Sequence, residues 1–194
     1  MAPTRDDEIE AARVGELGPT RADGPIHLAE YDPAWPSLYE REATRIQSIL
    51  GDQVLRLEHV GSTSIPGLAA KPVIDIVLAV PDSAHEAAYV SPLVSAGYVL
   101  RIREPGWFEH RVLNGPDTRV NLHVFSDGCP EIERMLAFRD RLRTHDDERR
   151  RYEEVKRDLA ARHWTYVQHY ADAKSGVVEA IIARALADRD GVGP

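Results

Sequence analysis

The sequence predicts an α/β or α+β domain with a helical C-terminal part, and two observations support that prediction. Between about residues 25 and 126, short runs of alternating or β-branched apolar residues are separated by segments with helical spacing. From about residue 130 to 188, only helical spacing remains. Strands with helices between them, followed by helices alone, are typical of a sheet flanked by helices. We therefore expect a single domain over residues 25–190, with its sheet core at 25–126 and its helical part at 130–188.

The composition restricts the classes of protein to which the chain can belong. Its 194 residues are 43% hydrophobic, which suits one globular domain with a real core. The net charge of −8 argues against broad binding to a nucleic-acid backbone. The chain lacks an apolar run of about 18 residues and an apolar secretory signal, so we expect a cytoplasmic protein without a membrane partner. The single cysteine, Cys129, excludes an internal disulfide and a cysteine-based zinc site.

The first elements are an arm, a strand and a helix. Residues 1–24 are acidic, contain glycine and proline, and show no sustained apolar period, so we expect a flexible arm. A short strand near Ile26 leads into a helix at residues 36–50, which has proline in its first turn and ends at Gly51.

Two strands then enclose a turn of small residues. The strand at residues 54–60 alternates, the chain turns at Gly61 and Ser62, and the strand at residues 73–80 is apolar on both faces, as in a central strand. Asp75 interrupts this apolar strand. A lone buried carboxylate is unfavourable unless it is paired or binds a metal ion. The structural alternative is an acid that caps the turn or pairs with a nearby lysine.

The second half continues the sheet and ends in helices. A helix at residues 83–96 precedes three strands, and on the last strand Arg119, Asn121 and His123 share one face. We expect this polar row to line a site beside Asp75.

Three helices follow, at residues 131–143, 147–163 and 165–187. Lys174 lies on or beside the apolar stripe of the last helix. From there it can either extend into solvent or reach an anion held against the sheet.

The turn of small residues predicts an anion-binding site. Gly61 permits close approach of backbone to a ligand, and Ser62, Thr63 and Ser64 offer hydroxyl groups. The stretch has neither the P-loop nor the dinucleotide-binding spacing. With Asp75 one strand later, the pattern suits a phosphate and its divalent cation.

The string EHVGSTSIPGLAAKPVIDIVLAV at residues 58–80 resembles the signature of the GrpB family. The resemblance extends to YDPAWP, NLHVF, LAFRDRLRTHDDERRRYEEVKRDLA and YADAKSGVVEAI, and covers residues 26–186. It implies a branch of the nucleotidyltransferase (polymerase-β-like) superfamily, with a mixed sheet flanked by helices.

The resemblance also implies roles for individual residues. Gly61 and Ser62 would hold a triphosphate, and Asp75 would be the first metal-binding acid. The second acid of the superfamily pattern is replaced by Val77, and the later strand offers Asn121 and His123 in place of the third. Such a site could hold one Mg²⁺ or Mn²⁺ ion on Asp75 and His123, the expected catalytic pair, supplemented by Glu58 or His59.

Three functions are consistent with these residues. The first is a nucleotidyltransferase that moves NMP from an NTP, with ATP as first candidate, to a small-molecule acceptor. The second is a non-catalytic nucleotide-binding or protein-partner module, for example one that assists dephospho-CoA kinase. The third is a metal-dependent hydrolase that uses His59, His110, His123 and Asp75. We expect the phosphates to be held by Gly61, Ser62, Thr63, Ser64, Lys71, Arg119, Asn121, Arg139, Lys156 and Lys174.

Overall fold

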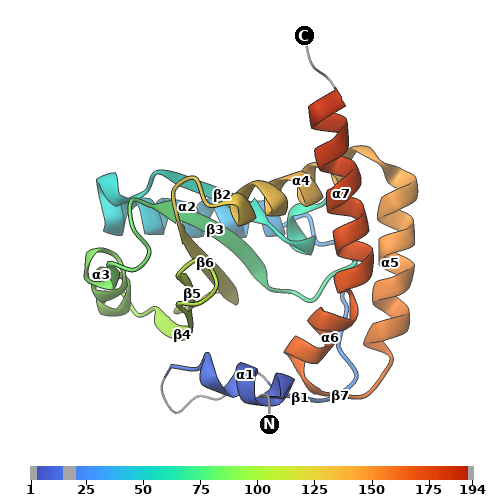
Figure 1. Cartoon of the computed structure of the whole chain (residues 1–194), viewed down its shortest axis with the longest axis horizontal. Coiled ribbons are helices and arrows are strands. Elements are labelled where there is room, and N and C mark those ends of the chain that lie inside the picture. The colour runs from blue at the N-terminus through green and yellow to red at the C-terminus, as the bar shows by residue number, and fades with distance from the viewer. Residues whose placement is uncertain (1–3, 15–20, 192–194) are drawn as a thin grey trace.

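The computed structural model describes residues 4–14 and 21–191, and a five-stranded sheet lies at its centre (Figure 1). Its strands are β2 (Arg56–Val60), β3 (Ile74–Val80), β4 (Val99–Glu104), β5 (His110–Asn114) and β6 (Val120–Ser126). They lie in the order β2-β3-β6-β5-β4, with β3 and β6 parallel and the other neighbouring pairs antiparallel. The sheet is therefore mixed, and the predicted sheet flanked by helices is confirmed.

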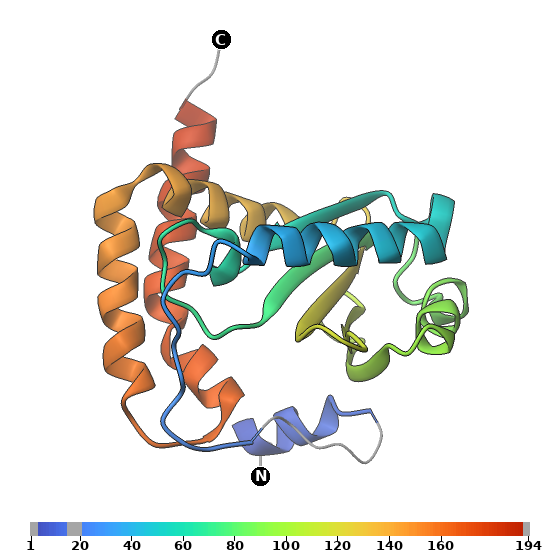
Figure 2. The same ribbon diagram turned by 180° about the vertical axis from the view of Figure 1, so that it is seen from behind.

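Two helices cover one face of the sheet. The long helix α2 (Trp35–Leu50) runs along the strands (Figure 2), and α3 (Val90–Ser95) lies beside it. Ile76 and Leu78 of β3 point to this side and are fully buried in one core cluster with Ile46 of α2. These residues have the even register of β3, as the alternation predicts.

The opposite face of the sheet carries the other register. Val77 and Phe125 pack there against Leu136 of α4 (Pro130–Thr144). Asp75 lies on the same face, two residues before Val77, and about three-tenths of its side chain remains exposed. This face of the sheet therefore has two parts: an apolar part that α4 covers, and a polar end at Asp75.

The helical part packs against that polar end and has a core of its own. In Figure 1, α5 (Asp146–Ala160) and α7 (Ser175–Gly191) stand as two columns beside the sheet. Leu142, Tyr152 and Ile181 come from three different helices and are buried together. Helix α6 (Val167–Ala173) completes this part, and 3-10 turns lie at Gly51–Gln53, Ser62–Ser64 and Glu86–Ala88.

No helix within residues 4–14 and 21–191 combines the length and apolar character needed to cross a membrane.

The arm predicted at residues 1–24 contains regular structure in its described part. Helix α1 (Arg5–Ala11) begins with a capping box. Arg5 forms an ion pair with Asp172, so the helix is attached to the C-terminal half. Residues 1–3 and 15–20 lie outside the described residues.

Two predicted helices are divided in the structure. The helix expected at 83–96 is a 3-10 turn followed by α3. Pro92 lacks an N–H and is tolerated only in a first helical turn, so the helix begins shortly before it. The helix expected at 165–187 is a strand and two helices, because β7 (Trp164–Tyr166) pairs with β1 (Arg21–Gly24) before α6 begins.

Candidate functional site

A cavity of about 420 Å³ lies between the polar end of the sheet face and the C-terminal helices. This volume is within the range of sites for small molecules. Residues from β3, β6, the turn after β2 and helices α4 to α7 line it. The polar positions in its wall are Gly61, Ser62, Thr63, Lys71, Asp75, Asn121, His123, Glu131, Lys156, Gln168 and Lys174.

The turn after β2 is shaped around Asp75. Gly61 has φ 67° and ψ −171°, a conformation that is essentially restricted to glycine. A Cβ atom at Gly61 would lie 2.4 Å from Oδ2 of Asp75, well inside van der Waals contact. The glycine therefore allows the Asp75 carboxylate to rest directly against the backbone of the turn.

Asp75 is held by two neighbours from the parallel strand β6. The register places Asn121 opposite Asp75, and Asn121 Nδ2 donates a hydrogen bond of 2.9 Å to Asp75 Oδ1. His123 Nε2 lies 3.9 Å from the same oxygen, an ion-pair distance. Burial would raise the pKa of Asp75, but a protonated His123, the hydrogen bond from Asn121 and the charge of Lys71 hold it below its usual range. Asp75 is therefore a carboxylate at neutral pH.

All three lysines of the chain line this cavity. The chain has 24 basic residues, and every one outside the cavity wall is an arginine. Lys156 Nζ donates a hydrogen bond of 2.5 Å to the carbonyl oxygen of Ala69. Lys174 Nζ lies 4.3 Å from the centre of the Tyr170 ring. The cavity thus gathers three ammonium groups around the single carboxylate of Asp75, with Glu131 as a further acid in its wall.

Burial makes these ammonium groups unusually acidic. Burial and the charge of Lys174 lower the pKa of Lys156 to about 7. Burial lowers the pKa of Lys174 to about 8, against the attraction of Asp75, and burial also lowers the pKa of Lys71. Burial is the largest cause of all three shifts, and repulsion from neighbouring positive charges adds to it. An anion in the cavity would favour the charged form of each lysine.

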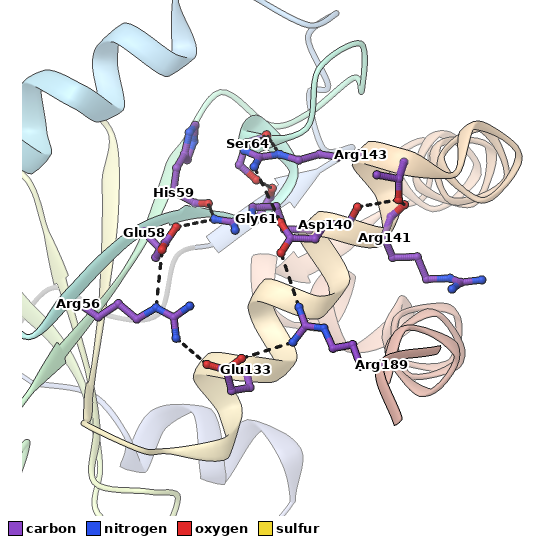
Figure 3. Close-up of polar contacts among 12 residues, drawn as sticks. Arg56, Glu58, His59, Gly61, Ser64, Glu133, Asp140, Arg141, Arg143 and Arg189 are labelled. Atoms are coloured by element: carbon purple, nitrogen blue, oxygen red, sulfur yellow. Dashed lines mark hydrogen bonds and ion pairs between the residues drawn. The ribbon is translucent and has the colours of Figure 1, made fainter. Parts of the chain in front are cut away.

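Several predicted site residues belong to a structural network elsewhere. Figure 3 shows Glu58, His59 and Ser64 in this network, beside α4. Arg139 NH1 donates to Glu58 Oε2 at 2.8 Å and to the carbonyl oxygen of His59 at 3.0 Å. None of these four lines the cavity. Glu58 and Arg139 are thus engaged with each other.

The side chains of His59 and Ser64 are likewise occupied. His59 Nε2 lies 3.1 Å from Thr63 Oγ1, and its ring stacks on Tyr39 of α2, on the far face of the sheet. Ser64 Oγ donates to the Gly61 carbonyl, while the Ser64 carbonyl accepts from Arg143 (Figure 3). These contacts stabilise the turn on the side opposite the cavity. The side chains of His59 and Ser64 therefore do not line the cavity.

Arg119 is also separate from the site. It precedes the first residue of β6, is exposed and does not line the cavity. The other predicted phosphate-binding residues, Gly61, Ser62, Thr63, Lys71, Asn121, Lys156 and Lys174, meet there with Asp75 and His123.

The donor set does not match a two-metal centre. In the described ranges, no three His, Cys, Asp or Glu side chains form a group that could hold a metal ion. Asp75 and His123 remain as two donors, with three lysines in the same wall. Two-metal transfer depends on several carboxylates that clamp both ions. These residues therefore do not fit a catalytic pair of Mg²⁺ or Mn²⁺ ions.

A chain of side chains behind His123 was not predicted as a unit. His110 Nε2 lies 3.1 Å from His123 Nδ1, and His110 Nδ1 lies 2.7 Å from Glu104 Oε2. Burial lowers the pKa of His110 to about 4, although Glu104 opposes this shift. The residues come from β4, β5 and β6, so alternation in neighbouring strands was the signal that could have linked them.

Comparison with known proteins identifies the family. The model of the family described as GrpB protein matches residues 25–184. The chain belongs to the GrpB family. The crystal structure of conserved protein GrpB from Enterococcus faecalis is 33% identical, with a TM-score of 0.75, over 84% of this chain and 99% of that one. The sheet and helical part therefore recur in a solved GrpB structure.

Two relatives differ in how much of their length matches this chain. A UPF0157 protein of Halalkalibacterium halodurans is 59% identical over 185 residues, which are 95% of this chain and 94% of the relative. A protein of Mycolicibacterium paratuberculosis named dephospho-CoA kinase is 32% identical over 167 residues, which cover 73% of this chain and 41% of that protein. GrpB sequences thus occur both alone and as part of longer proteins.

Proposed function

We propose that this GrpB protein binds a phosphorylated small molecule, with a nucleotide as first candidate, in the cavity between the sheet and α4 to α7. One observation carries the proposal: the three lysines of the chain all line that cavity, while the other Lys or Arg positions are all arginines. A buried cluster of like charges is unfavourable unless a ligand compensates it. A di- or triphosphate supplies that compensation.

The other parts of the wall suit the same ligand. The turn Gly61–Thr63 presents small residues, and Gln168 and Asn121 add side-chain amides. Val178, Ile182, Phe138 and Tyr170 line the remainder, so the cavity has an apolar side. An apolar wall beside a cationic one fits a base or another organic group that is joined to phosphates.

In this proposal the lysines neutralise the phosphate oxygens, as bound metal ions do in many phosphoryl-transfer enzymes. Phosphoryl-transfer sites neutralise phosphate oxygens with metal ions, lysine or arginine. Here Lys71, Lys156 and Lys174 are present, and the carboxylates needed for a metal pair are not grouped among the residues described. Binding is therefore expected to persist without Mg²⁺ or Mn²⁺.

Transfer of NMP to a small acceptor is a second candidate, favoured by the positions of Asp75 and His123. These side chains lie on neighbouring parallel strands and face the same cavity. Bound phosphates would therefore lie beside a carboxylate and an imidazole, the groups that serve in proton transfer. Release of pyrophosphate in the presence of an acceptor would distinguish transfer from binding.

The deciding measurement is calorimetric titration with ATP, GTP, CTP, UTP and inorganic pyrophosphate, each with and without Mg²⁺. We expect micromolar binding of at least one of these ligands by the wild type. Lys174→Met and Lys71→Met should each weaken it by about 10- to 100-fold, because a hydrogen bond to a charged group contributes about 1.5–3 kcal/mol.

Arg119→Met is the matched control, because Arg119 is exposed and outside the cavity wall. It removes one positive charge that acts on Lys71 only through space, so it should change the affinity far less than Lys174→Met does. If no ligand binds at millimolar concentration, or if Arg119→Met weakens binding as much as Lys174→Met, the cavity is not the phosphate site.

The kinase-named relative supports a narrower proposal about partners. Its match covers 41% of its length, so a GrpB domain and a further segment share one chain there. We propose that the present chain can act beside such a kinase as a separate protein. Co-purification of the two chains, with a Lys174→Met variant to test the role of the cavity, would examine this.

A further inference from the structure

A hydrogen-bonded series of side chains, Glu104–His110–His123, ends at the cavity and takes no part in the proposed phosphate binding. It joins the neighbouring strands β4, β5 and β6 across one face of the sheet. His110 is 4% exposed and His123 is partly open to the cavity. A hydrogen-bonded chain with one end at a ligand site can fix where protons reside.

The packing around His110 holds its ring in one orientation. The ring stacks on Phe125 with centroids 4.6 Å apart, and Trp107 meets it edge-on at 5.0 Å. The loop that brings Trp107 there contains two residues with positive φ, Phe108 at 54° and Glu109 at 50°. Non-glycine residues in this region are unfavourable and persist where the surrounding structure imposes them.

The hydrogen-bond partners determine which nitrogen of each ring carries a proton. The Glu104 carboxylate can only accept, so Nδ1 of His110 must donate to it. In a neutral, buried His110 whose Nδ1 donates, Nε2 is an acceptor. Nδ1 of His123, 3.1 Å away, must then donate to that Nε2. A neutral His123 therefore presents a bare Nε2 to the cavity.

We propose that the Glu104–His110 pair fixes His123 as the proton acceptor of the cavity, with His123 as a catalytic base and His110 as its positioning residue. The inference deepens the proposed function and rests on it, because the group that loses the proton belongs to a ligand or acceptor in the cavity. That group is a hydroxyl or a water molecule. Its O–H bond breaks, the proton joins Nε2 of His123, and the oxygen keeps the electron pair.

The charges around His123 favour this transfer. Asp75 Oδ1 lies 3.9 Å from Nε2, so the imidazolium that forms faces a carboxylate. Glu131 of α4 also lines the cavity and interacts electrostatically with His123. On the other side, Glu104 balances the positive charge through His110. If the ligand is a nucleoside triphosphate, the freed oxygen bonds to its α-phosphorus while the bond to the bridging oxygen breaks and pyrophosphate leaves.

The test is the protonation state of each imidazole nitrogen, measured by long-range ¹H–¹⁵N correlation on ¹⁵N-histidine-labelled full chain without ligand at pH 7.5. His110→Phe and His123→Gln variants assign the two rings among the eight histidines. We expect both rings to carry hydrogen on Nδ1 and a bare Nε2. A wild-type His123 with hydrogen on Nε2 and a bare Nδ1 would overturn the proposal.

The variants separate positioning from simple support of the fold. His110→Phe keeps an aromatic ring against Phe125 but removes the acceptor, so hydrogen on His123 should move to Nε2, toward Asp75. Glu109→Ala is the control, because it removes a carboxylate of the same loop that pairs with Arg111 and takes no part in the Glu104–His110–His123 hydrogen bonds. It should leave the His123 signals unchanged. An unchanged His123 tautomer in His110→Phe would refute the positioning role, whether or not any nucleotide binds.

Discussion

Replacing Gly61 with alanine tests how closely the turn is built around Asp75. The added Cβ would lie 2.4 Å from Oδ2 and 3.0 Å from Cγ of Asp75. The backbone conformation alone is unfavourable for alanine by about 1–3 kcal/mol. We expect the shift of Asp75 that relieves the overlap to break its hydrogen bond with Asn121, and such a charged hydrogen bond contributes about 1.5–3 kcal/mol. We expect a loss of about 3–5 kcal/mol in the free energy of unfolding.

Gly67→Ala is the matched control. Gly67 also has positive φ, at 77°, but its added Cβ would meet no heavy atom within 4 Å. It should lose about 1–2 kcal/mol from the backbone term alone. Urea denaturation with a fluorescence readout measures both losses. If Gly61→Ala is no more destabilising than Gly67→Ala, the contact between the turn and the carboxylate has no energetic importance.

A double-mutant cycle locates the cause of the loss. Asp75→Ala removes Oδ2 and Cγ, which are two of the three atoms that the new methyl group would meet. In that background, Gly61→Ala should be less destabilising than in the wild type, with a coupling of about 1–2 kcal/mol. Additive effects would show that the loss arises from the backbone conformation and not from Asp75.

Three further predictions concern protons and charges. Burial lowers the pKa of His59 to about 4, so the unfolded chain binds more protons between pH 6.5 and 4. The free energy of unfolding should therefore decrease by up to about 3 kcal/mol as the pH is lowered from 6.5 to 4. His59→Gln should reduce this dependence of stability on pH, whereas His85→Gln, at an exposed position, should not. Pyrophosphate binding at pH 7.5 should take up protons at the cavity lysines, seen as a calorimetric enthalpy that changes with the buffer's ionisation enthalpy. A buffer-independent enthalpy would contradict this. Arg139→Met should reduce the free energy of unfolding by about 1–3 kcal/mol without changing phosphate affinity, because Glu58 and the His59 carbonyl lose their donor. Unchanged stability on urea denaturation would contradict the structural role of Arg139.

Alternation along single strands was sufficient to predict one wall of the site. Asp75 shares a face with Val77, while Asn121 and His123 share a face on β6, and the parallel pairing brings these faces together. The pairing itself is a long-range property, and the sequence carried it only through the family resemblance.

The same alternation explains why neighbours of the turn are absent from the cavity. Val60 pairs with Asp75 and lines the cavity, so His59 must point to the opposite face, where Tyr39 stacks on it. Glu58 has the register of Val60 but pairs with Val77, where α4 covers the sheet and supplies Arg139. Closeness to a motif along the chain therefore did not place a side chain in the site.

The division of labour between lysine and arginine connects the fold to the proposed function. Arginine remains charged in every environment, and the ion pairs between elements use it, as in Arg141–Glu148 and Arg134–Glu179. Lysine can lose its proton when it is buried. An unliganded cavity with three arginines would hold three fixed charges against one carboxylate, whereas Lys156 and Lys174, with pKa values of about 7 and 8, can shed part of theirs. Lysines therefore make the empty cavity less unfavourable than arginines would. In our proposal an anion that enters favours the charged form of these lysines, which would couple binding to proton uptake near neutral pH.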